Sequence, residues 1–225
     1  MNLIVFDIDD TLTKSEYQHQ LAYVNTMNEF GITQIDTNWK EYTHHTDSFI
    51  LKENYERNHD LKFDFSIVSA FENQMTNTIL SLEEVSEING AKNIVEFFNE
   101  QTDYAIAFAT GSFLKPARVK LKQAEIKFNE ELVIGSNEFF EREEIVKEAI
   151  IQAEKYHNVN HFNEIISVGD GIWDLKTARN LGVHFIGIGM KNYADFQKNN
   201  IKVHIEDWND FNLSLIEEKL GIRNT

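Results

Sequence analysis

Four aspartates lie in two closely spaced pairs far apart in the chain, and each pair follows a short apolar run. Asp7 and Asp9 are two residues apart, so both side chains point to the same side as the chain leaves an extended segment. Asp170 and Asp174 lie in the segment Gly-Asp-Gly-Ile-Trp-Asp, whose glycines let the backbone turn tightly beside a ligand. Crowded carboxylates repel one another, and a hard divalent cation that prefers oxygen ligands, above all Mg²⁺, removes that penalty. The two pairs predict a magnesium site if the fold brings them together.

Three continuous apolar runs end directly before polar residues, and two of these runs precede the aspartate pairs. The remaining run ends at Thr110-Gly111-Ser112. A strand that is apolar throughout is typical of a parallel sheet with helices on both faces. The strong runs cover residues 3–6, 104–109 and 165–168, and weaker runs that predict further strands cover residues 131–134, 184–188 and 203–205.

Helical periodicity lies between these runs, over residues 115–123, 142–156, 173–181 and 208–220. From about residue 91 onward, the alternation of strand and helix predicts an α/β fold with a doubly wound parallel sheet. In open sheets of this class, ligands bind beyond the carboxyl ends of the strands. The fold is therefore expected to place both aspartate pairs and Thr110 at one edge of the sheet.

Residues 15–89 differ from the rest of the chain because they carry long helical patterns and no convincing buried strand. The patterns cover residues 17–30, 39–58 and 65–82. Asn89-Gly90 is a typical turn at which the chain returns to the sheet. We predict an α/β core of residues 1–14 and 90–225, and an all-helical cap of residues 15–89 inserted after the first strand.

The composition excludes several classes of function. A formal net charge of −16 repels polyphosphate backbones and disfavours nucleic-acid binding. With no cysteine, the chain has no disulfides, thiol nucleophiles or thiolate metal sites. The N-terminus does not resemble a signal peptide, and no apolar run reaches the roughly 18 residues that span a bilayer. We expect a cytoplasmic protein that binds no membrane, and its oligomeric state stays open.

Three segments resemble motifs of the haloacid dehalogenase superfamily, in the order found there. Residues 5–13 (VFDIDDTLT) resemble the first motif, residues 107–112 (AFATGS) the second, and residues 168–174 (VGDGIWD) the fourth. The resemblance covers nearly the whole chain and is strongest to the subgroup of phosphoglycolate phosphatases and phosphomutases, which carry a helical cap. It implies the predicted α/β core, a cap that supplies substrate specificity, and Mg²⁺ as cofactor.

The resemblance also implies roles for the motif residues. Asp7 would attack phosphorus and form an aspartyl-phosphate, which divides one hard step into two. Asp9 would protonate the leaving alkoxide and then activate water. The implied metal ligands are Asp7, Asp9 (through its backbone carbonyl), Asp170 and Asp174. The implied phosphate ligands are the Thr110 hydroxyl and the backbone amides of Gly111 and Ser112, at the beginning of a helix where N–H groups are free.

The third motif departs from the commonest pattern of the superfamily, because the usual Gly-Lys-Pro is missing. Residues 140–147 offer Arg142 or Lys147 as the cation that offsets the charge of nucleophile and phosphate. Arg142 is favoured, since it opens a predicted helix and a guanidinium grips phosphate through two N–H groups. Within the predicted cap, His44 and His45 are either substrate contacts or ordinary surface histidines.

The function predicted from these features is Mg²⁺-dependent hydrolysis of the phosphate monoester of a small metabolite. Asp9 argues against a dehalogenase, which needs no acid for its leaving group. A phosphomutase of the same superfamily uses the same residues and is the alternative. Two alternatives belong to other classes. A receiver-like signalling module is disfavoured by the Asp-Ile-Asp-Asp-Thr pattern of residues 7–11 and by the predicted cap. A phosphate-binding protein without catalysis is disfavoured by the intact set of Asp7, Asp9, Thr110 and Asp170.

Overall fold

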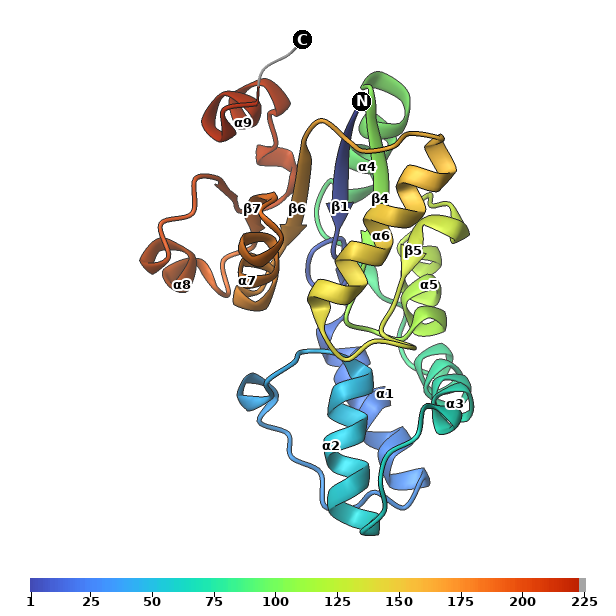
Figure 1. Cartoon of the computed structure of the whole chain (residues 1–225). Coiled ribbons are helices and arrows are strands. Elements are labelled where there is room, and N and C mark those ends of the chain that lie inside the picture. The colour runs from blue at the N-terminus through green and yellow to red at the C-terminus, as the bar shows by residue number, and fades with distance from the viewer. Residues whose placement is uncertain (223–225) are drawn as a thin grey trace.

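The computed structural model describes residues 1–222, so the last three residues of the predicted core lie outside the described part of the chain. Six strands form one parallel sheet in the order β5-β4-β1-β6-β7-β8 (Figure 1). The predicted α/β fold is thereby confirmed. The strands are β1 (Asn2–Phe6), β4 (Tyr104–Ala109), β5 (Val133–Ile134), β6 (Ile165–Gly169), β7 (His184–Ile188) and β8 (His204–Ile205).

The central strands are apolar throughout because helices cover both faces of the sheet. Ile4 and Phe6 of β1 pack toward one face, against Phe98, and Leu3 and Val5 pack toward the other. The first face is covered by α4 (Ala91–Gln101), α5 (Leu114–Gln123) and α9 (Leu213–Leu220). The second face is covered by α6 (Arg142–His157) and α7 (Ile172–Leu181), and α8 (Tyr193–Lys198) packs beside α7. Helices α4 and α8 are not among those predicted from the sequence.

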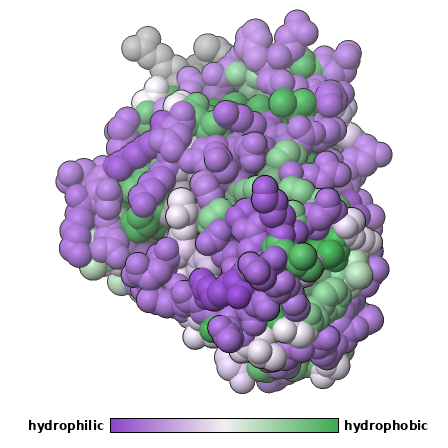
Figure 2. All heavy atoms as spheres, turned by 60° about the horizontal axis from the view of Figure 1, so that its bottom comes forward, coloured by the Kyte–Doolittle hydropathy of each residue, from purple (hydrophilic) through white to green (hydrophobic). Residues whose placement is uncertain are grey.

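Three further helices lie beyond the carboxyl ends of the central strands (Figure 1), and we call them the cap helices. They are α1 (Glu16–Glu29), α2 (Asp47–His59) and α3 (Val68–Ser81). Tyr23, Leu51 and Phe71 build an apolar cluster between them, and Phe113 joins this cluster from the sheet side. Figure 2 shows the molecule with the cap helices turned toward the viewer. This face is mainly hydrophilic, and its apolar groups lie in separate areas. None of the helices in residues 1–222 combines the length and apolar character needed to cross a membrane.

A two-stranded antiparallel sheet lies where the chain enters and leaves the cap helices. It pairs β2 (Thr13–Lys14) with β3 (Ser86–Glu87). The sequence predicts no strand in either place, because two residues are too short to show a periodicity. The pairing holds the segment that enters the cap helices beside the segment that leaves them.

The prediction of two continuous helices is wrong, because each of them is interrupted near its N-terminal end. The helix expected over residues 39–58 is a 3₁₀ turn, Trp39–Glu41, followed by an extended segment and then α2. The Thr46 hydroxyl oxygen accepts a hydrogen bond from the N–H of Phe49 and caps α2. The helix expected over residues 208–220 likewise divides into Trp208–Asp210 and α9, where the Asn212 side chain accepts from the N–H of Leu215. Polar caps override the helical periodicity in both places.

Candidate active site

The carboxyl ends of β1, β4 and β6 converge beneath the cap helices. The parallel register sets Phe6 beside Phe108 on one side and beside Val168 on the other. The residues after these strand ends therefore come together, as predicted. Residues from all three strand ends line one cavity of about 150 Å³ between the sheet and the cap helices, namely Asp7, Asp9, Asp10, Thr110, Gly111, Ser112 and Asp170.

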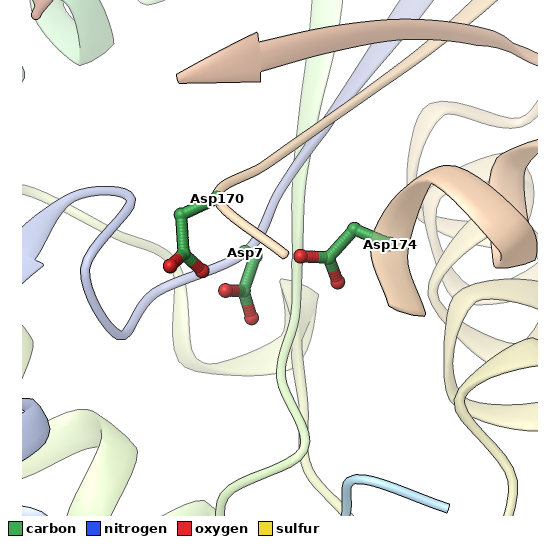
Figure 3. A group of neighbouring side chains, drawn as sticks. All are labelled: Asp7, Asp170 and Asp174. Carbon is green, nitrogen blue, oxygen red and sulfur yellow. The ribbon is translucent and has the colours of Figure 1, made fainter. Parts of the chain in front are cut away.

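Three aspartates form a buried acidic group, and two of them, Asp7 and Asp170, line this cavity. The carboxylates of Asp7, Asp170 and Asp174 point toward one another, with oxygen atoms within 4.8 Å (Figure 3). Burial raises the pKa of Asp7 to about 7, and the negative charges of Asp174 and Asp9 act in the same direction, against the attraction of Arg142. Burial and the charges of Asp174 and Asp7 also raise the pKa of Asp170 well above its ordinary value. The protein thus concentrates negative charge that its own cations do not fully balance.

The donor set of this group fits a hard divalent cation. All three residues offer carboxylate oxygen, and Mg²⁺ prefers oxygen ligands. Burial raises the pKa values of all three carboxyls, and repulsion between them adds to this for Asp7 and Asp170. A dication at this point would relieve that repulsion. The side chain of Asp9 does not belong to the group, and its carboxylate instead pairs with a lysine described below.

Arg142 is the cation that the fold brings to the acidic group. Its Nη2 atom lies 2.9 Å from Oδ1 of Asp7 and 2.5 Å from Oδ1 of Asp174. Burial would lower the pKa of the guanidinium, but the charges of Asp174 and Asp7 raise it above its ordinary value. The alternative cation, Lys147, lies further along α6 with an exposed side chain. The geometry of the two residues favours Arg142, as the sequence analysis does.

The segment after β4 runs directly beneath the cap. Oγ1 of Thr110 accepts a hydrogen bond of 3.1 Å from the N–H of Ser112. Gly111 has no room for a side chain, since a Cβ atom there would lie 2.4 Å from the carbonyl oxygen of His45 and 2.6 Å from Nη1 of Arg142. The glycine is therefore required for the close approach of the cap segment to the sheet.

The structure separates the two histidines of the predicted cap. His45 lines the cavity and stacks on the indole of Trp173, with ring centroids 4.2 Å apart. Burial and the nearby charge of Arg142 lower the pKa of His45 to about 4, so the ring is neutral at physiological pH. His44 packs against Phe49 and lines a neighbouring outer cavity. Of the two candidate substrate contacts, only His45 lies at the acidic group's cavity.

A buried lysine, Lys120, completes the surroundings of Asp9 and was missed by the sequence analysis. Its Nζ atom lies 2.5 Å and 2.7 Å from the two carboxylate oxygens of Asp9. Burial would raise the pKa of Asp9, but the charge of Lys120 and the hydrogen bonds from Lys120 and Ser15 lower it to about 2. A signal was present in the sequence, because Lys120 falls at helical spacing from Ala117 and Ala124 on the apolar side of α5.

One family of known proteins matches most of this chain. Residues 1–182 match the model of a family described as haloacid dehalogenase-like hydrolase. The chain belongs to that family. A search of curated proteins found no match. The matched residues include every predicted site residue of this haloacid dehalogenase-like hydrolase. They also include β2 and β3, the two segments that connect the sheet to the cap helices.

Solved structures with low sequence identity share the fold of this hydrolase. A family IA variant 3 hydrolase from Entamoeba histolytica has a TM-score of 0.73 at 17% identity, with 98% of this chain and 100% of that chain covered. A β-phosphoglucomutase from Clostridium difficile has a TM-score of 0.70 at 19% identity, with 97% and 96% covered. A CbbY mutant from Rhodobacter sphaeroides in complex with xylulose-(1,5)bisphosphate has a TM-score of 0.67 at 15% identity, with 92% and 95% covered.

Two acidic residues of the cap helices tie the cap of this hydrolase to its sheet, and the sequence analysis missed both. The Asp47 carboxylate accepts hydrogen bonds from the N–H of Phe113 at 2.8 Å and lies 2.9 Å from Nε2 of His19. Glu72, also buried, accepts from the N–H of Lys115. No local pattern marks them, because their partners are far away in the sequence.

Proposed function

We propose that this hydrolase cleaves the phosphate monoesters of small metabolites, with Asp7 as its nucleophile and Mg²⁺ as its cofactor. One observation carries the proposal. Asp7, Asp9 and the Thr110 hydroxyl line a single cavity in which a buried guanidinium, that of Arg142, lies beside the Asp7 carboxylate. Such a site offers a carboxylate nucleophile, a second carboxylate for proton transfer and hydrogen-bond donors for an anion.

Asp7, Asp170 and Asp174 would hold the metal ion, together with the backbone carbonyl of Asp9. Bound Mg²⁺ supplies positive charge that offsets the carboxylates and polarises the phosphoryl group. Arg142, which donates to the Asp7 carboxylate, would neutralise Asp7 and donate hydrogen bonds to the phosphoryl oxygens. The Thr110 hydroxyl and the N–H groups of Gly111 and Ser112 would hold the remaining oxygens.

The reaction divides into two transfers of the phosphoryl group. In the first, an oxygen of the Asp7 carboxylate attacks phosphorus, the ester P–O bond breaks, and the leaving alkoxide takes a proton from Asp9. In the second, Asp9 removes a proton from water, which attacks phosphorus and releases phosphate and the Asp7 carboxylate. The low pKa of Asp9 leaves its carboxylate ionised, so the group does not carry a proton of its own into the reaction. For the first step, a phosphate monoester, whose second pKa is about 6, can bring the proton into the site.

We also propose that residues 15–89 act as a cap that excludes water and selects the substrate. The contacts of Asp47 and Glu72 with the sheet side support this role, because they hold the cap helices over the cavity. A cavity of about 150 Å³ under a cap favours a small molecule over a macromolecule. The xylulose bisphosphate bound by the Rhodobacter sphaeroides protein supports a phosphorylated sugar as substrate class. The cytoplasmic location remains a prediction from the sequence.

Phosphate release from a panel of metabolite phosphomonoesters tests the proposal. The panel includes sugar phosphates, phosphoglycolate, nucleoside monophosphates and phosphoserine, each with Mg²⁺ and with a chelator. We expect release from a few members, dependent on Mg²⁺ and lowered at least about 1,000-fold by Asp7→Asn. Asp103→Asn, at an exposed position next to β4, is the matched control and should leave the rate unchanged.

A phosphomutase would interconvert sugar phosphate isomers without net release of phosphate. A coupled assay for the second isomer, run on the same panel, therefore separates the two activities. If neither phosphate release nor isomer formation is detected from folded protein, the proposed catalysis is wrong.

A further inference from the structure

Lys120 is the least expected residue near the cavity. Its side chain is 0% exposed, although lysine is almost never fully buried unless it is paired. The ammonium group has three N–H donors, and the structure supplies acceptors for all of them: the Asp9 carboxylate, Nδ1 of His19 at 3.1 Å and Oγ of Ser112 at 3.2 Å. A buried charge with every donor satisfied holds its partners in one arrangement.

We infer that Lys120 is a positioning residue that sets the orientation of the Asp9 carboxylate toward the leaving group. The inference rests on the proposed function, in which Asp9 protonates that group. Lys120 does not itself line the cavity, whereas Asp9 does and is 24% exposed toward it. Lys120 therefore acts through Asp9 and does not touch the substrate.

The contacts also distinguish the two oxygens of Asp9. Oδ1 accepts hydrogen bonds from Lys120 and from the Ser15 hydroxyl, each at 2.5 Å. Oδ2 accepts only from Lys120, at 2.7 Å, among the contacts of residues 1–222. Oδ1 is thereby anchored between two donors, and Oδ2 is the oxygen left to exchange a proton with the leaving group. Rotation of the carboxylate would break the contact of Oδ1 with the Ser15 hydroxyl.

His19 extends this arrangement into the cap helices. Its Nε2 atom lies 2.9 Å from Oδ1 of Asp47, and Nδ1 faces the Lys120 ammonium. A ring with its proton on Nε2 donates to Asp47 and accepts from Lys120, so one tautomer satisfies both contacts. Lys120 therefore contacts His19 on the cap side and Ser112 on the sheet side. These two contacts fix the position of its ammonium group beside Asp9.

Leaving groups of different basicity test the inference. An alkyl phosphate releases a strongly basic alkoxide that needs a proton, whereas p-nitrophenyl phosphate releases an anion that needs little help. The ratio kcat/KM reports the steps up to departure of the leaving group. For Lys120→Met we expect kcat/KM for the best alkyl substrate of the panel to fall about 100-fold, the range of general acid catalysis, and that for p-nitrophenyl phosphate to fall less than about threefold.

Lys122→Met is the matched control, since Lys122 lies on the same helix with an exposed side chain paired to Glu130. It should change neither value. An equal fall for both substrates in folded Lys120→Met, or no fall for either, would overturn the inference and assign the lysine a structural role. Failure of the proposed function is a separate result, because it shows as undiminished turnover by Asp7→Asn.

If circular dichroism shows that Lys120→Met does not fold, Ser15→Ala serves as the second variant. It removes the other anchoring contact of Oδ1 without removing a charge. We expect the same selective loss, about three- to tenfold, for the alkyl substrate alone. Equal values of kcat/KM for Ser15→Ala and the unaltered protein on both substrates would overturn the inference.

Discussion

The N–H of Asp47, at the start of α2, donates a hydrogen bond of 2.8 Å to the carbonyl oxygen of Gly111, directly after β4. This contact joins the cap to the segment proposed to bind phosphate. A movement of the cap helices therefore changes the surroundings of that segment directly. Contacts of Asp47 and Glu72 with the sheet side therefore also bear on the site.

Gly111→Ala should separate the cap from the sheet. Its Cβ atom would lie 2.4 Å from the His45 carbonyl oxygen, and overpacking of this kind costs about 1–3 kcal/mol. We expect a lower midpoint of thermal unfolding and a fall in kcat/KM of at least about tenfold, since displacement of catalytic groups by about 1 Å can cost roughly 100-fold. Asp103→Asn, at an exposed position next to β4, is the control. Normal kcat/KM in the Gly111→Ala variant would show that the close approach is unnecessary.

Arg142→Met should abolish most of the turnover, because it removes the only cation in contact with Asp7 among residues 1–222. We expect kcat to fall at least about 100-fold, as for removal of a donor that stabilises transition-state charge. Steady-state kinetics on the best substrate of the panel measures the effect. Lys147→Met removes an exposed charge from the same helix and should leave kcat within about twofold. The opposite ranking of the two variants would return Lys147 to the role of the site cation.

Metal-free protein should lose stability as the pH rises. The pKa of Asp7 is about 7 in the folded protein against an ordinary value of 3.8. A carboxyl whose pKa is raised by folding binds its proton more tightly when folded, so its stabilising contribution is lost between pH 3.8 and about pH 7. Thermal unfolding with a chelator should show a falling midpoint from about pH 5 to about pH 8. Asp7→Asn should flatten this slope.

Mg²⁺ should raise the unfolding midpoint more at about pH 8 than at about pH 5, because protonated carboxyls bind a cation weakly. The same scans, repeated with added metal, measure this difference. Sodium chloride of equal ionic strength is the control for screening. A midpoint that Mg²⁺ leaves unchanged at the higher pH would contradict a metal site at Asp7, Asp170 and Asp174.

His45→Ala and His44→Ala should differ in their effect on substrate binding. The His45 ring closes one side of the cavity by stacking on Trp173, whereas His44 lies against Phe49 in the outer cavity. We expect His45→Ala to raise KM about three- to tenfold, given the roughly 0.5–1.5 kcal/mol of an aromatic pair. His44→Ala should change KM less than about twofold. Equal effects of the two variants would show that the stacking on Trp173 does not shape the site.

Much of the fold follows from short-range patterns. The three strong apolar runs form central strands of the sheet, because a run that is apolar on both faces is stable only between two layers of helices. The weaker runs also contribute strands, but of residues 131–134 only Val133–Ile134 is a strand, after a 3₁₀ turn at Glu130–Leu132. The breaks at residues 42–46 and 211–212 were not predicted, since Thr46 and Asn212 act as caps only once the following turn has formed. Likewise, the two-residue strands β2 and β3 form only because the segments that enter and leave the cap helices lie next to each other.

Local patterns in the chain are enough to establish the α/β class, the strand ends at which polar residues gather, and the order of the motifs that carry Asp7, Thr110 and Asp170. Those features depend on neighbours within a few residues. Only the folded chain brings Lys120 into contact with Asp9. Likewise, only the fold decides that Arg142, and not Lys147, contacts Asp7. These pairs join residues more than a hundred positions apart. Their meeting depends on how α5 and α6 pack on the sheet, which no local spacing encodes.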